Sequence, residues 1–170
     1  MPVKDLRTVA RILQIGFVHA NSVHPKLDSS NSQTTPQMQI SRASRSGAPS
    51  IQGDKAIANA FTGNNVYIDP VLNAEGMSIA NVTFTPGART HWHTHEKGQI
   101  LRVVTGSGWV CDIGGQPVRI NVGDVIWCPP GTKHWHGADD DSYMCHQATS
   151  FGVVTWEEEV GDQEYAKKSG

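Results

Sequence analysis

The sequence predicts an all-β fold, a barrel or a sandwich, over residues 51–170. Short segments rich in β-branched and aromatic residues recur every 8 to 12 residues from residue 61 onward. Glycine, proline or aspartate separates each segment from the next. Helical stretches are expected only near the two ends of the chain. Many short strands with regular turns are typical of two-layered β folds.

The expected strands follow one another along the chain. NNVYIDP is a short strand that ends at Pro70, because proline cannot donate to a strand ladder. GMSIANVTFTPG alternates apolar and polar positions, as a half-buried strand does. DIGGQP is a tight hairpin, because Gly114 and Gly115 can take the positive φ of a primed turn. Further strands are expected in QILRVVTG, GWVCDIGG, QPVRINVGD, VIWCPPG and YMCHQATSF.

Both ends of the chain differ from this β region. Residues 1–50 are interpreted as an N-terminal extension, with a weak helix from Lys4 to about His19 and then a flexible or surface-draped segment. That segment is rich in Ser, Gln, Thr and Pro, so little burial offsets the entropy of ordering it. At the other end, TWEEEVGDQEYAKK is expected to be a short helix. Residues 51–170 are expected to form the single folded domain.

Composition excludes several classes of partner and location. The formal net charge of −2 offers no basic surface for nucleic acid or anionic lipid. No segment has the roughly 18 apolar residues that span a bilayer. Three cysteines with no C-x-x-C pair indicate buried thiols in a reducing compartment, so a cytoplasmic location is expected. The alternative is an organellar location directed by residues 1–37, which carry Arg7 and Arg11.

Histidines are concentrated in two short segments of the β region. THWHTH carries His91, His93 and His95, and KHWHG carries His134 and His136. Alternate residues of a strand share a face, so the histidines of each segment can point the same way. A single H-x-H pair is more often two surface histidines on a strand than part of a metal site. Two pairs facing one interior would instead bring four or more imidazoles together, and a bound cation would satisfy them.

These residues occur at the spacing of a known pair of motifs. PGARTHWHTHEKGQILRVVTGSG resembles the first cupin motif, G(x)5HxH(x)3–4E(x)6G, with Gln99 at the position of the acid. GDVIWCPPGTKHWHG resembles the second, G(x)5PxG(x)2H, and ends at His134. The resemblance implies a small double-sheet jelly-roll barrel of the cupin type with a metal inside. It also implies that the ligands are His93, His95, Gln99 and His134.

The similarity extends from Phe61 to Tyr165. Short segments along this stretch are similar to the small single-domain cupins that include manganese-dependent hydroxynitrile lyases. These segments are FTG, VTF, PGART, GQ, PPG, KHWHG and the final W, E, V, D and EY. Members of this group carry glutamine at the fourth ligand position. They often begin with Met-x-Ile-x-Arg, which MQISR at Met38 resembles, so residues 1–37 are interpreted as an extension or an upstream start.

A neutral ligand set has a chemical consequence. Three imidazoles and one amide leave a divalent ion its full charge, so the ion is a stronger electrophile than with a carboxylate ligand. Such donors suit manganese, the ion that the resemblance favours, and also iron, nickel or zinc. Glu96 is the other candidate for the acid position. It follows His95 directly, so it is expected to face away.

The remaining polar residues of the expected interior suggest catalytic groups. By the resemblance, His136 and His146 stand beside the metal as acid and base, and an imidazole with an ordinary pKa suits proton transfer at neutral pH. The alternative is that they only orient a ligand. His91 is either a pocket donor or a residue at the irregular start of a strand. By the same resemblance, Ala80, Val82 and Thr90 are expected to line the substrate pocket. Four tryptophans are expected to pack the barrel wall: Trp92, Trp109, Trp127 and Trp135.

Three functions are compatible with these residues. A lyase would bind a small hydroxy or carbonyl compound while His136 moves a proton and a C–C or C–X bond breaks. A dioxygenase would use manganese or iron at the same open positions, and a non-enzymatic cupin would only bind metal or a small molecule. A dioxygenase would not require His136 and His146, so they favour the lyase. The resemblance further implies a homo-oligomer, a dimer or a tetramer.

Overall fold

The computed structural model describes residues 38–41 and 49–168, and residues 41–170 group into one compact unit. Twelve strands and two short helices are assigned in the described residues, and the first strand begins at Ile51. The helix expected over Lys4–His19 and most of the segment after it lie outside these residues. The boundary expected between residues 50 and 51 therefore stays a prediction. No helix in the described part of the chain is long and apolar enough to cross a membrane.

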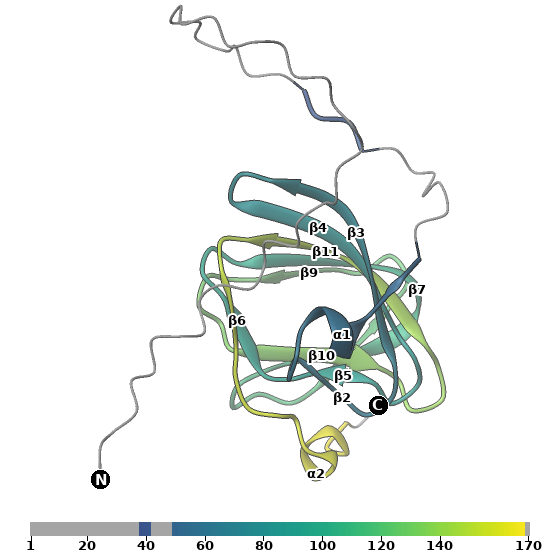
Figure 1. The fold of residues 1–170 in the computed structure, drawn as a ribbon. Coiled ribbons are helices and arrows are strands. Elements are labelled where there is room, and N and C mark those ends of the chain that lie inside the picture. Colours follow the sequence, from purple (N-terminus) through teal and green to yellow (C-terminus); the bar gives the residue numbers. More distant parts are fainter. Residues whose placement is uncertain (1–37, 42–48, 169–170) are drawn as a thin grey trace, which may run out of the picture. The chain divides into compact units, whose positions relative to one another are not determined.

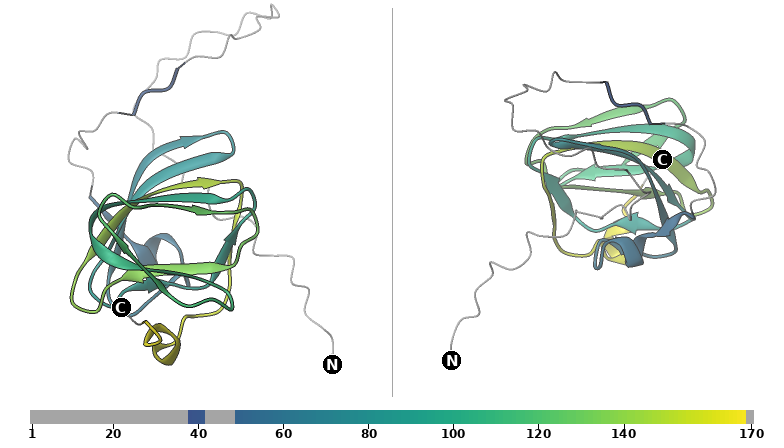
Figure 2. Two further views of the ribbon diagram at one scale, coloured as in Figure 1. Left: turned by 180° about the vertical axis from the view of Figure 1, so that it is seen from behind. Right: turned by 45° about the horizontal axis from the view of Figure 1, so that its top comes forward.

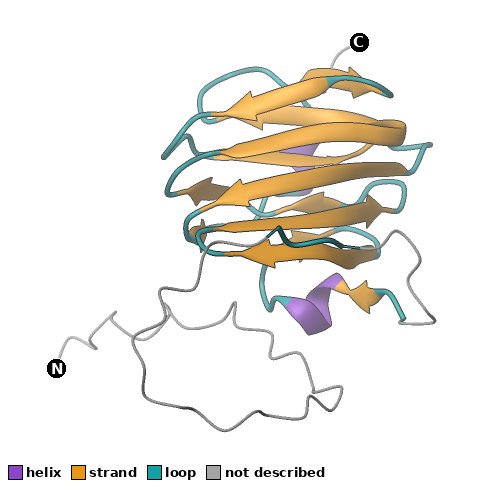
Figure 3. Cartoon of the chain, turned by 90° about the horizontal axis from the view of Figure 1, so that it is seen from above, coloured by secondary structure: helices purple, strands orange, loops and turns teal. Residues whose placement is uncertain are grey.

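The strands form two antiparallel layers that face each other (Figures 1 and 2). In the first layer β3, β4, β11, β7 and β9 lie side by side, as Figure 3 shows from above, and β1 pairs with β3. The strands of this layer are β1 (Ile51–Gln52), β3 (Val66–Ala74), β4 (Met77–Phe84), β7 (Gln99–Asp112), β9 (Val125–Cys128) and β11 (Met144–Phe151). The predicted all-β, double-sheet barrel is thus confirmed.

The second layer joins the C-terminal half of β7 to short strands from distant parts of the chain. In it β10 pairs with β5, β6 and β7, while β2 pairs with β5, β12 with β6 and β8 with β7. Its other strands are β2 (Phe61–Thr62), β5 (Arg89–Thr90), β6 (His93–His95), β8 (Val118–Asn121), β10 (His134–Ala138) and β12 (Val154–Trp156). The helix α1 (Gly53–Ala56) precedes β2.

One bent strand connects the two layers. QILRVVTG and GWVCDIGG were expected as two strands, but they form the single strand β7. Gly106 has a φ of +74° there, and a Cβ at this position would lie 1.8 Å from the carbonyl oxygen of Tyr143. Residues before Gly106 pair with β11, and residues after it pair with β8 and β10. The glycine therefore allows the strand to pass from one sheet to the other.

Two further expectations about strands were wrong. The strand through Pro70 does not end there, because β3 continues to Ala74 with a change of register between Pro70 and Leu72. Such an irregularity accommodates a residue that cannot donate a hydrogen bond. In the hairpin between β7 and β8 the Gly115 amide donates to Asp112 O, but only Gly114 has a positive φ. A primed turn that uses both glycines is therefore absent from this hairpin.

Side chains pack in two separate apolar clusters. The first fills the space between the layers and contains Val66, Val82, Phe84, Ala88, Leu101, Val103, Ile120, Cys128, Ala138, Met144 and Ala148. The second contains Trp92, Trp109, Cys111, Trp135, Val160 and Tyr165. Tyr165 belongs to α2 (Asp162–Tyr165), which lies outside the second layer (Figure 1). Three of the tryptophans thus pack as expected, but Trp127 does not, because 52% of it is exposed.

The C-terminal segment is only partly the expected helix. Residues 154–156 form β12 instead, and helical structure is limited to the four residues of α2. Pairing with β6 explains this difference, because Trp156 stands opposite His93 in that ladder. Tertiary pairing outweighs a weak local helical preference in such a short segment.

Candidate metal centre

Three buried histidines from two paired strands meet inside the barrel. His93 and His95 are at the two ends of β6, and His134 begins β10 directly opposite His93. Strand alternation places Trp92 and Trp135 in the outer cluster, so the histidines beside them face inward. One ring nitrogen from each of His93, His95 and His134 lies within 4.8 Å of the other two. This separation suits three ligands of one metal ion.

Backbone carbonyls fix the orientation of two of these rings. His93 Nδ1 lies 3.0 Å from His91 O, and His134 Nδ1 lies 2.9 Å from Thr132 O. A carbonyl oxygen only accepts hydrogen bonds, so each Nδ1 carries a proton and donates it. In a neutral ring the Nε2 atom then presents a lone pair. Both rings are therefore oriented as metal ligands usually are, with one nitrogen anchored and the other free to coordinate.

Burial keeps these rings neutral. It lowers the pKa of His93, His95 and His134, and for His95 to about 4. The neighbouring imidazoles lower the pKa values of His93 and His95 further, because two positive rings would repel each other. Neither ring nitrogen of His95 has a hydrogen-bond partner among the described residues. Neutral imidazoles that are buried together and incompletely bonded fit a divalent cation.

Gln99 completes the group with an oxygen atom. Its Oε1 lies 3.2 Å from His134 Nε2, and its Nε2 donates to Ser150 Oγ at 3.0 Å. Because His134 already donates from Nδ1, a neutral His134 presents a lone pair to the lone pairs of the amide oxygen. Two such acceptors are compatible at this distance when a cation lies beside them. The structure thus brings together all four residues of the expected ligand set, and the donor set fits a metal.

A second pair of histidines lies beside this group. His146 Nε2 is 3.1 Å from His136 Nδ1, and both rings are buried. The His136 ring centroid is 5.2 Å from that of His93, and the backbone N–H of His136 donates to Thr90 Oγ1. Burial lowers the pKa of both rings, for His146 to about 4. The ordinary pKa expected from the sequence is therefore wrong, because the barrel removes water from these rings.

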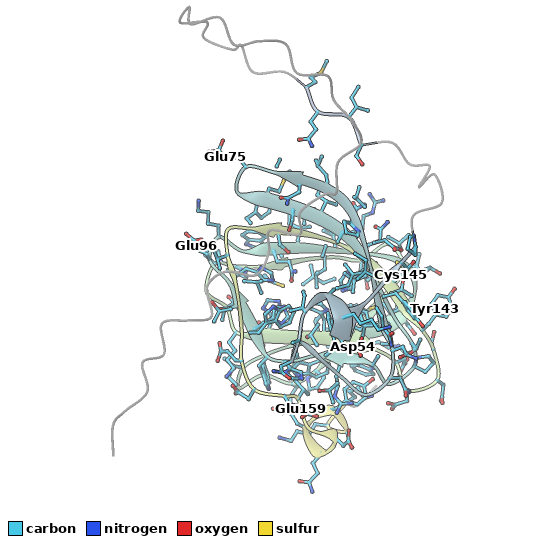
Figure 4. The ribbon with its side chains drawn as sticks, in the orientation of Figure 1. Asp54, Glu75, Glu96, Tyr143, Cys145 and Glu159 are labelled. Atoms are coloured by element: carbon cyan, nitrogen blue, oxygen red, sulfur yellow. The ribbon has the colours of Figure 1, made fainter. Side chains whose placement is uncertain are left out.

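The side chains of His91 and Glu96 are not part of the group formed by His93, His95 and His134. The contribution of His91 that the structure shows is its carbonyl oxygen, which holds the His93 ring. Its own side chain is 9% exposed and is not one of the three that could hold an ion together. Glu96 points away from the barrel, where its carboxylate accepts from the backbone N–H of Val153 (Figure 4). Its predicted outward orientation is confirmed.

Apolar side chains surround the histidines. Val82 is the cross-strand neighbour of His146, and Ala80 is the neighbour of Ala148. Val82 belongs to the packed interior and Ala80 packs against it. That they line a substrate pocket stays a prediction. Phe84 packs against both His136 and His146, with centroid distances of 5.7 and 5.4 Å.

Sequence reasoning missed two contributors to the site. The Trp156 ring lies 4.7 Å from that of His93 and 5.8 Å from that of Phe61. The segment of Trp156 was interpreted as a helix, so nothing in its local pattern placed it near β6. Phe61 stands in a two-residue strand, which is too short to reveal an alternation.

The double-sheet β-barrel and the buried histidines from both motifs place this chain in a class of barrel proteins that could hold a metal ion. Residues 80–146 match the cupin domain family. The chain is also 45% identical over 120 residues to the (R)-mandelonitrile lyase of Granulicella tundricola. This match covers 66% of this chain and 91% of the relative. The protein therefore belongs to the cupin family, and within it the chain is similar to a hydroxynitrile lyase.

Solved structures agree with this assignment. A cupin-like protein of Thermotoga maritima superimposes with a TM-score of 0.64 and 37% identity, covering 69% of this chain and 93% of that one. A polyketide cyclase of Streptomyces resistomycificus superimposes with a TM-score of 0.58 over 75% of this chain and 91% of its own. Its 15% identity supports the shared fold alone.

Proposed function

We propose that this protein is a metal-dependent, lyase-like cupin that cleaves a C–C or C–X bond in a small hydroxy or carbonyl compound, with a hydroxynitrile as the first candidate substrate. The observation that carries this proposal is the bonded pair His136 and His146 beside the His93, His95 and His134 group. The identity of 45% to a protein named (R)-mandelonitrile lyase supports the choice of substrate class.

His93, His95, Gln99 and His134 are the residues that would hold the ion, and manganese is the ion proposed. When bound, a divalent ion supplies a Lewis acid that polarises a substrate oxygen. The four donors are neutral, so they do not reduce its charge. Burial excludes water from these side chains and strengthens every electrostatic interaction among them.

His136 is the proposed general base. Its Nδ1 is occupied by His146, whereas its Nε2 is buried and has no hydrogen-bond partner among the described residues. With Nδ1 protonated and donating to His146, Nε2 has a lone pair that can take the hydroxyl proton of a hydroxynitrile. The C–C bond then breaks, its electron pair leaves with cyanide, and the cyanide carbon accepts the same proton from Nε2. An aldehyde and hydrogen cyanide result, and His136 returns to its starting state.

His146 shares the charge that His136 acquires during this step. A hydrogen bond between the rings stabilises the positive form of His136, which burial otherwise disfavours. Thr90 holds the backbone of His136 in place through its hydroxyl group. Phe61, Phe84 and Trp156 provide an aromatic wall next to the histidines. Such a wall suits a substrate with an apolar or aromatic substituent.

Purified full-length protein tests this proposal directly. Elemental analysis should find a divalent metal bound in a ratio close to one per chain, and mandelonitrile should release benzaldehyde and cyanide. His136→Ala is expected to lower kcat/KM by at least roughly a hundredfold with unchanged metal content. Cys145→Ser is the matched control, because Cys145 adjoins His146 on β11 but lies on the outside of the barrel (Figure 4).

Three outcomes would contradict parts of the proposal. A wild-type protein that binds no metal in titration would exclude the metal site. Full cleavage activity in His136→Ala would exclude the assigned base. Oxygen consumption with a diketone or catechol, and no cleavage of hydroxynitriles, would replace the lyase with an oxygenase.

A further inference from the structure

The amide of Gln99 differs from the other proposed ligands in having two unlike ends. An imidazole ring that is anchored by a backbone carbonyl has only one nitrogen to offer. The Gln99 side chain, in contrast, can rotate by half a turn and exchange an oxygen for an NH2 group, which cannot coordinate a cation. The partner of the NH2 group therefore bears on whether Oε1 can face the ion.

Ser150 contacts the other end of this amide. Gln99 Nε2 donates to Ser150 Oγ at 3.0 Å, while Oε1 lies 3.2 Å from His134 Nε2. The two residues are direct cross-strand partners, Gln99 on β7 and Ser150 on β11. Ser150 is half-buried and Gln99 is buried, so water competes little for the amide nitrogen.

We propose that Ser150 is a positioning residue that accepts from the amide nitrogen of Gln99 and so holds this side chain with its oxygen toward the metal site. This inference rests on the proposed metal site. Each of three ligands then has its own anchor: His91 O for His93, Thr132 O for His134 and Ser150 Oγ for Gln99. Two of these anchors are backbone atoms that no substitution removes. Ser150 is the side chain among the three, so it is the anchor that mutation can test.

Manganous ion titrated into metal-free full-length protein provides the measurement. Ser150→Ala is expected to raise the Kd for manganese roughly tenfold, because the amide nitrogen then loses its acceptor and the side chain loses its anchor. Ser150→Thr keeps a hydroxyl group and should bind within about threefold of wild type. Thr149→Ala is the control, since Thr149 adjoins Ser150 on β11 but faces the other side of the sheet.

A second background separates orientation from general damage. Gln99→Ala removes the amide that Ser150 contacts and leaves the three histidines in place. Adding Ser150→Ala to Gln99→Ala should therefore change the Kd by less than about threefold. The melting temperature of each metal-free variant reports whether the fold is intact.

The results that would overturn the inference are distinct from those that overturn the proposed function. Wild-type manganese affinity in Ser150→Ala would remove the assignment of Ser150 and leave the metal site in place. An equal loss of affinity when Ser150→Ala is made in the wild type and in Gln99→Ala would show that Ser150 acts through the fold and not through the amide. A wild-type protein that does not bind manganese would overturn both proposals.

Discussion

His146 Nε2 lies 3.1 Å from His136 Nδ1, and both rings are buried where β10 and β11 face each other across the barrel. This contact joins two residues that no shared strand ladder brings together. The two rings lie at different distances from the proposed metal site. His136 is next to His93, and His146 is behind His136 against Phe84.

Replacing His146 is expected to slow the reaction without releasing the metal. His146→Leu removes the partner of His136 Nδ1 but keeps a similar volume, so kcat for hydroxynitrile cleavage should fall about tenfold to a hundredfold while KM changes little. Steady-state kinetics together with elemental analysis measures both effects. An unchanged kcat would exclude a role for the pair, and a parallel loss of metal would assign His146 to metal binding.

Gly106 is expected to be essential for the bend in β7. In Gly106→Ala the new Cβ would lie 1.8 Å from Tyr143 O at a φ of +74°, so unfolding free energy should fall by at least about 3 kcal/mol. Gly114→Ala is the matched control. Its φ is +75°, but no atom lies within 4 Å of the added Cβ, so a loss of about 1 kcal/mol is expected. Urea-induced unfolding measures both free energies. Similar decreases in the free energy of unfolding for the two variants would contradict this account of the bend.

Arg89 is expected to hold the C-terminal segment against the outer cluster. Its Nε donates to Val160 O, its guanidinium stacks on Tyr165, and its side chain is 3% exposed. Arg89→Ala leaves the Val160 carbonyl unsatisfied and should lower the unfolding free energy by roughly 3 kcal/mol.

Asp162→Asn serves as the control for Arg89. The Asp162 side chain is 94% exposed, so its ion pair with Arg89 should contribute less than about 1 kcal/mol. Chemical denaturation of both variants tests the comparison. If Asp162→Asn lowered the free energy of unfolding as much as Arg89→Ala, the ion pair, and not the buried hydrogen bond, would hold the C-terminal segment.

Trp127 is expected to lie in a contact between two copies of the chain. Val125 and Trp127 on β9 are 64% and 52% exposed, and alternation along the strand places them on the same face. The homo-oligomer that the resemblance implies would cover them. Trp127→Ser should therefore reduce the mass measured by light scattering after gel filtration, whereas Val153→Ser, at an exposed turn, should not. A monomeric wild-type protein would contradict this expectation.

The sequence by itself determined which side chains share a face. Period-two alternation separated His93 and His95 from Trp92, and His134 and His136 from Trp135, because successive residues of a strand point to opposite sides. The resemblance to the first cupin motif identified Gln99 as well, because Gln99 occupies the position of the acid in that motif. Local patterns failed where a long strand bends at Gly106 and where Trp156 pairs with β6.

Only the tertiary structure decided which of these faces meet. The contacts of Ser150 with Gln99 and of His146 with His136 join residues that are 51 and 10 positions apart. Strand pairing, and not local preference, fixes such distances. The low pKa values of the histidines are likewise a property of the closed barrel, because desolvation depends on the side chains that distant strands place around each ring.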